Sequence, residues 1–149
     1  ASKKAIAWAR ENQERSGLSQ APIRWICDDA GAFVEREIRR GRQYDAVVMD
    51  PPAYGRGPNG EVWSLFDGLA TLVSRCGALL SQNPSFFLLS AYALRLSSFS
   101  IAELLVDLDR GGMIETGEVL LRSSYGKRDF ATSLFARWTP NEVPPIDGK

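Results

Sequence analysis

Two patterns of hydrophobic residues alternate along the chain, and together they predict its fold class. Nearly continuous apolar runs, which are typical of buried strands, occur at residues 23–27, 44–50 and 86–90. Apolar residues spaced three or four positions apart, which indicate helices with one buried face, occur at residues 2–16, 30–40, 61–81 and 98–110. Alternating helices and strands of this kind are typical of an α/β domain with a parallel sheet.

The C-terminal part of the chain breaks this alternation. Residues 114–122 and 130–138 both have strand-forming sequences, and only the short polar stretch 123–129 separates them. Strands joined by so short a connection pair antiparallel, because a parallel pair needs a long crossover. We therefore predict an α/β fold whose sheet is mostly parallel with a terminal antiparallel strand, followed by an irregular tail at residues 139–149.

Composition and charge limit the chemistry that the chain can perform. Eighteen basic residues balance 18 acidic ones, so no strong field draws the chain to a polyanion. Histidine is absent, which excludes a histidine base or histidine metal ligand within these 149 residues. The two cysteines, Cys27 and Cys76, form no CxxC motif and no Cys/His cluster. No apolar run has membrane-spanning length, so we expect a cytoplasmic protein with no metal site and no membrane association.

Polar residues follow three of the predicted strands, at residues 27–30, 50–54 and 90–92. In sheets with parallel strands, ligands bind beyond the carboxyl ends of the strands. Because all three segments stand at such ends, we expect their side chains to face one site.

The second of these segments carries the clearest chemistry. Pro51 and Pro52 stiffen the backbone after Asp50, and their carbonyls stay free to accept hydrogen bonds. Asp50 and the Pro51 carbonyl can hold an exocyclic amino group, and Tyr54 can stack on the ring that carries it. The simpler alternative is a strand end stopped by two prolines, with Asp50 as a turn cap.

The run Asp50-Pro51-Pro52-Ala53-Tyr54 resembles the DPP-x-(F/Y) motif of class I S-adenosylmethionine-dependent methyltransferases, especially those related to the large-subunit ribosomal RNA methyltransferases. Residues 1–12 are similar to a helix of that family with the pattern S-x-x-A…A-x-x-N, and Asp28-Asp29-Ala30 is similar to its acidic adenine-site turn. The resemblance covers nearly the whole chain. It implies that residues 1–138 form the C-terminal part of a Rossmann-like catalytic domain.

The resemblance also implies two sets of site residues and one cofactor, S-adenosylmethionine. The catalytic set is Asp50, Pro51, Pro52 and Tyr54. The cofactor-binding set is Asp28, Asp29, Ala30 and Asp50. Asp29, or alternatively Asp28, would accept a hydrogen bond from the adenine amino group, and the Ala30 N–H would donate to a ring nitrogen. Capping of the following helix is the alternative role for the two acids, and one can cap while the other binds.

Two parts of the family's pattern are missing. No G-x-G-x-x-G turn occurs, and the chain begins after the expected position of the acid that binds the cofactor's ribose. The resemblance therefore implies that the N-terminal strands of the sheet lie outside this chain. We expect the excerpt alone to be inactive and to bind the cofactor weakly or not at all.

The segment after the next strand bears on the reaction type. Relatives that methylate a cytosine carbon carry a cysteine nucleophile there, whereas this chain has Ser90, Ala91 and Tyr92. The preferred function is therefore methyl transfer to a nitrogen of an RNA base, as in ribosomal RNA processing. The charge balance leaves open methylation of a small molecule or protein side chain, and the missing glycine-rich turn leaves open a non-catalytic domain that binds RNA or a partner.

Two clusters of basic residues are candidates for RNA contact. The first cluster, Arg36, Arg39, Arg40 and Arg42, is interleaved by Glu35 and Glu37, which favours a solvated helix face. Arg122, Lys127 and Arg128 flank the predicted terminal hairpin, where acceptor binding and a plain surface loop are both open.

Overall fold

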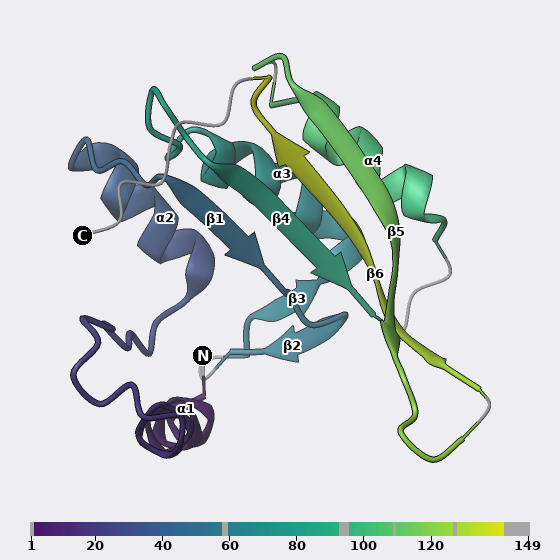
Figure 1. Cartoon of the computed structure of the whole chain (residues 1–149). Coiled ribbons are helices and arrows are strands. Elements are labelled where there is room, and N and C mark those ends of the chain that lie inside the picture. The colour runs from purple at the N-terminus through teal and green to yellow at the C-terminus, as the bar shows by residue number, and fades with distance from the viewer. Residues whose placement is uncertain (1, 58–59, 93–95, 109, 127, 142–149) are drawn as a thin grey trace.

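The computed structural model describes residues 2–57, 60–92, 96–108, 110–126 and 128–141 (Figure 1). Most of the expected irregular tail, residues 142–149, lies outside the described residues. Along the chain the elements are α1 (Lys3–Arg15), α2 (Ala30–Arg39), β1 (Ala46–Met49), β2 (Tyr54–Arg56), β3 (Val62–Ser64), α3 (Leu65–Gly77), β4 (Phe86–Ala91), α4 (Ser98–Val106), β5 (Met113–Leu121) and β6 (Phe130–Thr139).

The main sheet is mixed and has the strand order β1-β4-β6-β5. β1 and β4 run parallel, and β6 runs antiparallel to both β4 and β5. The predicted α/β fold with a terminal antiparallel pair is confirmed. β2 and β3 form a separate small hairpin between β1 and α3.

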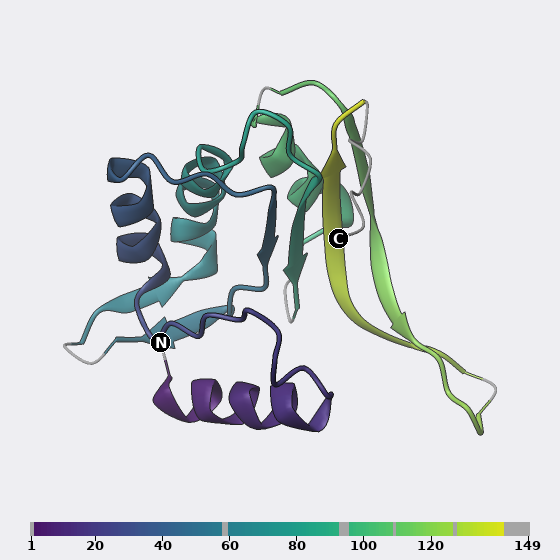
Figure 2. The ribbon, with the colours of Figure 1, turned by 60° about the vertical axis from the view of Figure 1, so that its left-hand side comes forward.

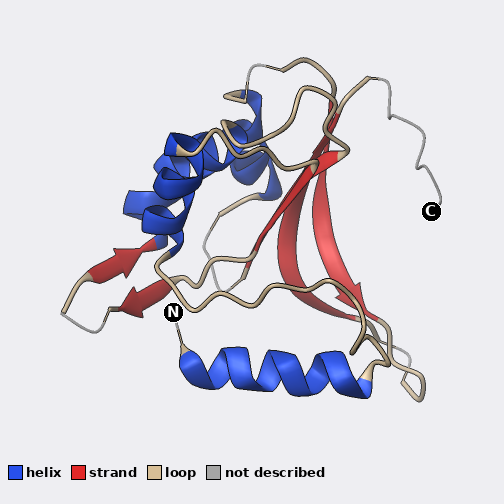
Figure 3. Ribbon diagram, turned by 90° about the vertical axis from the view of Figure 1, so that its left-hand side faces the viewer, coloured by secondary structure: helices blue, strands red, loops and turns tan. Residues whose placement is uncertain are grey.

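The core lies between the sheet and the helices α2, α3 and α4, which gather on one face of it (Figure 3). Phe87, Leu89 and Ala91 alternate along β4 and are completely buried on that face. Removing such side chains from water stabilises the fold by about 1.5–3 kcal/mol for each large residue. The opposite face departs from the expectation for a buried parallel strand, because Val48 of β1 is 65% exposed and no described element covers it.

Residues 23–27 do not form the predicted strand. An apolar run becomes a strand when a neighbouring backbone accepts its N–H groups, and no described strand runs alongside this segment. Its backbone instead turns at Ile23, whose N–H donates to the Ala21 carbonyl. The Trp25 indole N–H then donates to Gln13 Oε1 (2.6 Å), which connects the segment to α1.

The helix predicted at residues 61–81 is shorter than expected. Val62–Ser64 pairs with Tyr54–Arg56 as strand β3, so α3 begins at Leu65. The helical spacing of apolar residues continues through β3, and the competing strand pairing decides the local structure there. One consequence is that Phe66, which its spacing predicts to be a core residue, is 66% exposed at the start of α3.

Helix α1 lies beneath the sheet, apart from the other helices (Figure 3). Its ends follow the sequence: Ser2 Oγ accepts from the Ala5 N–H, and Gly17 follows the helix with φ of 71°. None of its residues is buried, and Trp8 is exposed. No helix of the described part is long and apolar enough to cross a bilayer.

Candidate functional site

Asp50 follows β1 at the edge where β4 also ends and where α2 begins (Figure 1). Met49 is paired with Leu89 in the parallel ladder, so the next residues, Asp50 and Ser90, lie side by side. Ser90 Oγ donates to Asp50 Oδ1 over 2.7 Å. In the described part of the chain the second carboxylate oxygen of Asp50 has no hydrogen-bond partner, so it can accept from a ligand.

The backbone after Asp50 is held at two carbonyls. The Trp63 indole N–H donates to the Pro52 carbonyl over 2.8 Å, and the Leu65 N–H donates to the Ala53 carbonyl over 3.1 Å. The expectation that both proline carbonyls stay free is therefore wrong for Pro52. The Pro51 carbonyl accepts no hydrogen bond from the described residues, and the side chain of Pro51 is buried.

The Trp63 ring has room because residue 68 is a glycine. A Cβ added at Gly68 would lie 2.3 Å from the ring. Trp63 is partly buried, and its hydrogen bond to Pro52 also fixes the loop. The helix-like spacing of residues 61–81 gave no indication of this contact.

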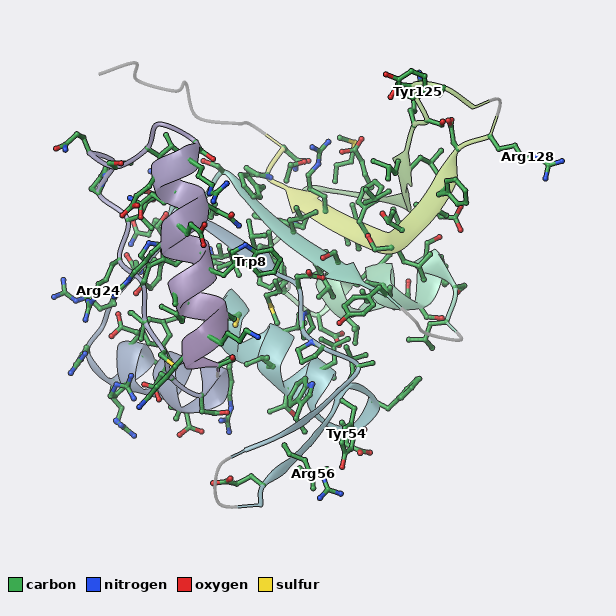
Figure 4. All side chains as sticks on the ribbon, turned by 90° about the horizontal axis from the view of Figure 1, so that it is seen from below. Trp8, Arg24, Tyr54, Arg56, Tyr125 and Arg128 are labelled. Atoms are coloured by element: carbon green, nitrogen blue, oxygen red, sulfur yellow. The ribbon has the colours of Figure 1, made fainter. Side chains whose placement is uncertain are left out.

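Tyr54 begins strand β2 and projects from the small hairpin beside Arg56 (Figure 4). Its side chain is 55% exposed, and its hydroxyl accepts from Arg56 Nε over 3.3 Å. This hydrogen bond holds the side chain at its hydroxyl, and part of the ring surface stays exposed to solvent. Such a ring can stack on a planar ligand.

The two acids before α2, Asp28 and Asp29, already interact with other groups of the chain. Asp29 caps the helix, because its Oδ1 accepts from the Ala32 N–H over 2.9 Å. Asp28 accepts from the Asp29 N–H and forms an ion pair with Arg36 (2.5 Å). The Arg36 guanidinium, followed by the Asp29 N–H, holds the pKa of Asp28 below its ordinary value. Capping by Asp29, one of the two alternatives, is therefore confirmed.

Two shallow hollows lie near this edge of the sheet. One of about 140 Å³ lies beside Tyr92, where the end of β4 meets β5 and β6. The other, of about 450 Å³, lies between α1 and residues 19–25. Asp29, Asp50 and Tyr54 line neither hollow, so their expected presence in one cleft stays a prediction. The described residues include no group of three or more potential metal ligands.

The arrangement of strands and helices matches solved structures. A SAM-dependent methyltransferase from Agrobacterium tumefaciens is 48% identical in sequence, with a TM-score of 0.86, over 94% of this chain. This chain has the class I methyltransferase fold. It spans 47% of the length of the Agrobacterium protein. No family model matches the sequence.

Two further proteins are similar to this chain, one in structure and one in sequence, over less of their own length. SMU.776, solved in complex with SAH (S-adenosylhomocysteine), is 18% identical with a TM-score of 0.69, over 93% of this chain and 37% of its own. A protein of Methanocaldococcus jannaschii, provisionally named a ribosomal RNA large subunit methyltransferase, is 34% identical over 55 residues. That match covers 37% of this chain and 14% of the archaeal protein.

Proposed function

We propose that this chain is the acceptor-binding half of an enzyme that transfers a methyl group from S-adenosylmethionine to a nitrogen of an RNA base. The observation that carries the proposal is the Ser90–Asp50 hydrogen bond at the carboxyl edge of the sheet. It orients one carboxylate oxygen and leaves the other available beside the Pro51 carbonyl. The Agrobacterium and SMU.776 similarities support the choice of cofactor.

The residues near α2 fit the adenine end of that cofactor. Asp29 uses Oδ1 for capping, and its Oδ2 has no partner among the described residues, so it can accept from the adenine amino group. Ala30 is the first residue of α2, where the backbone N–H has no partner within the helix. Asp28, which is paired with Arg36, is the weaker candidate of the two acids.

The chain's own groups position the acceptor. Asp50 Oδ2 and the Pro51 carbonyl would accept the two N–H hydrogens of an exocyclic amine, which turns the nitrogen lone pair toward the cofactor. Tyr54 would hold the base by stacking. When bound, S-adenosylmethionine supplies an electrophilic methyl group. As the new N–C bond forms, the bond between the methyl group and the cofactor's sulfur would break, with its electron pair kept by the sulfur. The nitrogen would lose one proton to water at the exposed carboxylate, so no histidine base is required.

Two observations support an RNA base as the acceptor over other methyl acceptors. The archaeal relative carries a ribosomal RNA methyltransferase name, although the match covers only 55 residues. The Asp50 and Pro51 acceptors suit an amino group on a planar ring, which Tyr54 can stack against. A carbon acceptor is disfavoured because Ser90, bonded to Asp50, stands where carbon-methylating relatives carry a cysteine.

The test is transfer of tritiated methyl to unmodified large-subunit ribosomal RNA by the full-length protein. Asp50→Ala should lower turnover on the order of 100-fold and leave cofactor affinity within a few fold, because Asp50 acts on the acceptor. Asp45→Ala is the matched control. Asp45 precedes the same strand at its other end and accepts from Ser81, so its loss should leave turnover unchanged.

The competing reaction, methylation of a pyrimidine carbon, would need a cysteine nucleophile. Cys27→Ser and Cys76→Ser should both keep activity. Loss of transfer in either variant, together with a covalent adduct between the wild-type protein and a fluorinated pyrimidine RNA, would establish carbon methylation and overturn the proposal.

A further inference from the structure

The β5–β6 hairpin continues past the edge that carries the candidate site (Figure 2). Ala91, the last residue of β4, pairs with Leu134, which pairs with Glu118, so residues 119–133 extend beyond the end of β4. We call these residues the hairpin arm. The four residues from Leu134 to Phe130 span about 13 Å at the usual strand rise. The arm therefore reaches well beyond Asp50 on the same side of the sheet.

Side chains of the hairpin arm are exposed on both of its faces. The ladder shifts register between Val119 and Leu120, and beyond this bulge no described element covers the two strands. The exposed large apolar residues of the arm are Val119, Leu120, Leu121, Tyr125 and Phe130. No described residue buries these apolar side chains, so they are available to a partner.

The charge of the arm identifies the kind of partner. It contains three basic residues, Arg122, Lys127 and Arg128, against one acid, Asp129, although the charges of the whole chain balance. The Arg122 side chain is 88% exposed, and its ion pair with Asp129 is stretched to 4.0 Å. Such a pair contributes little, so the guanidinium is available to a phosphate. Lys127 lies outside the described residues and enters here by its charge alone.

The tip of the arm carries an exposed aromatic ring. Ser123 Oγ accepts from the N–H groups of Tyr125 (3.3 Å) and Gly126 (2.7 Å), which sets the turn. Tyr125 is fully exposed, and it projects from the tip together with Arg128 (Figure 4). An exposed aromatic ring and guanidinium groups on one arm are features with which proteins bind single-stranded nucleic acid, by stacking and by phosphate contact.

We infer that the hairpin arm binds single-stranded RNA nucleotides that flank the acceptor base, an inference that rests on the proposed function. Tyr125 stacks on one of these bases, and Arg122 and Arg128 contact phosphates. Because the arm extends about 13 Å past the end of β4, beside which Asp50 lies, it meets neighbours of the acceptor and not the acceptor itself. The excess of positive charge favours RNA over a second protein surface.

Binding and methyl transfer by the full-length protein test this inference. The probes are an unmodified large-subunit RNA fragment and a shortened RNA that keeps the acceptor but lacks its flanking nucleotides. Tyr125→Ala should raise Kd and KM for the fragment by about 5- to 150-fold, and Tyr125→Phe should restore both. Turnover at saturating RNA and KM for the shortened RNA should stay unchanged.

Salt dependence tests the arginines separately. Arg122→Ala and Arg128→Ala should each reduce the slope of log K against log salt by about 0.7, the value for one contact to a single strand. Arg39→Ala, an exposed arginine of α2 outside the arm, is the matched control and should leave the slope unchanged.

The outcomes separate the inference from the proposed function. If the wild-type protein methylates RNA and Tyr125→Ala leaves KM unaltered, the inference alone is wrong. If it methylates no RNA, both fail together. If the Tyr125 variant keeps its RNA affinity but sediments at a different oligomeric state, the arm is a protein interface, and the inference is overturned.

Discussion

At the scale of single residues, two side chains convert a proline-rich strand end into a defined binding edge. Ser90 fixes one oxygen of Asp50, and Trp63 fixes the Pro52 carbonyl. Neither residue belongs to the Asp50–Tyr54 motif. With the Pro52 carbonyl occupied, the Pro51 carbonyl is the one left to act with Asp50 in the proposed acceptor site.

Replacing the Trp63 indole tests this account of the loop. Trp63→Phe keeps an aromatic ring against Gly68 but removes the hydrogen bond to Pro52. Because water can reach this carbonyl, stability should fall by about 1 kcal/mol or less, whereas turnover should fall roughly 10-fold as the loop loses its position. Steady-state kinetics and urea unfolding measure the two effects. Trp8→Phe, at an exposed tryptophan of α1, is the control, and wild-type turnover in Trp63→Phe would contradict the positioning role.

At the scale of elements, a buried carboxylate joins α2 to the start of β1. Glu37 is buried on α2, accepts from the Tyr44 hydroxyl (2.6 Å) and pairs with Arg40. The Tyr44 hydrogen bond is the largest influence on Glu37 and holds its pKa below the ordinary value, and the same contact raises the pKa of Tyr44. Tyr44 also bridges to Leu80, so this contact positions β1 and hence Asp50.

Tyr44→Phe should lower the urea midpoint of unfolding, because it removes a partner from a buried carboxylate. Since the folded pKa of Glu37 is depressed, its contribution is present above the unfolded pKa and is lost as pH falls through the folded pKa. The difference between wild type and Tyr44→Phe should therefore be largest near neutral pH and shrink in acid. Glu37→Gln, whose amide oxygen can still accept from Tyr44, should show no such shrinkage. A difference independent of pH would contradict the assignment.

At the scale of the whole molecule, the two cysteines differ in their exposure to solvent, so their reactivity measures how well the core excludes water. Cys27 is exposed, whereas Cys76 lies in the core on α3. Burial raises the pKa of the Cys76 thiol to about 11 from an ordinary 9.0. The thiol therefore stays protonated at neutral pH and packs as a small apolar group.

A thiol reagent should modify Cys27 rapidly in the folded protein and Cys76 only on unfolding. Because the folded pKa of Cys76 is raised, its stabilising contribution is complete below pH 9 and is lost as pH rises toward 11, by on the order of 2 kcal/mol. Chemical unfolding across this range, compared with Cys76→Ala, measures the loss. Rapid labelling of Cys76 in the native state would show that the core is open at α3.

The sequence by itself determined the elements whose signals are local. Hydrophobic periodicity, with caps such as Ser2 and Asp29, predicts most helices and strands, and Asp50 marks a strand end where a ligand can bind. Tertiary structure decided everything that depends on a neighbour in space. Residues 23–27 lack a strand partner and stay irregular, and Ser90 meets Asp50 because two parallel strands share a register. The spacing of apolar residues in the sequence indicates which side chains are buried. Strand pairing and side-chain hydrogen bonds depend instead on which segment of the chain lies alongside, and the local sequence does not specify that segment.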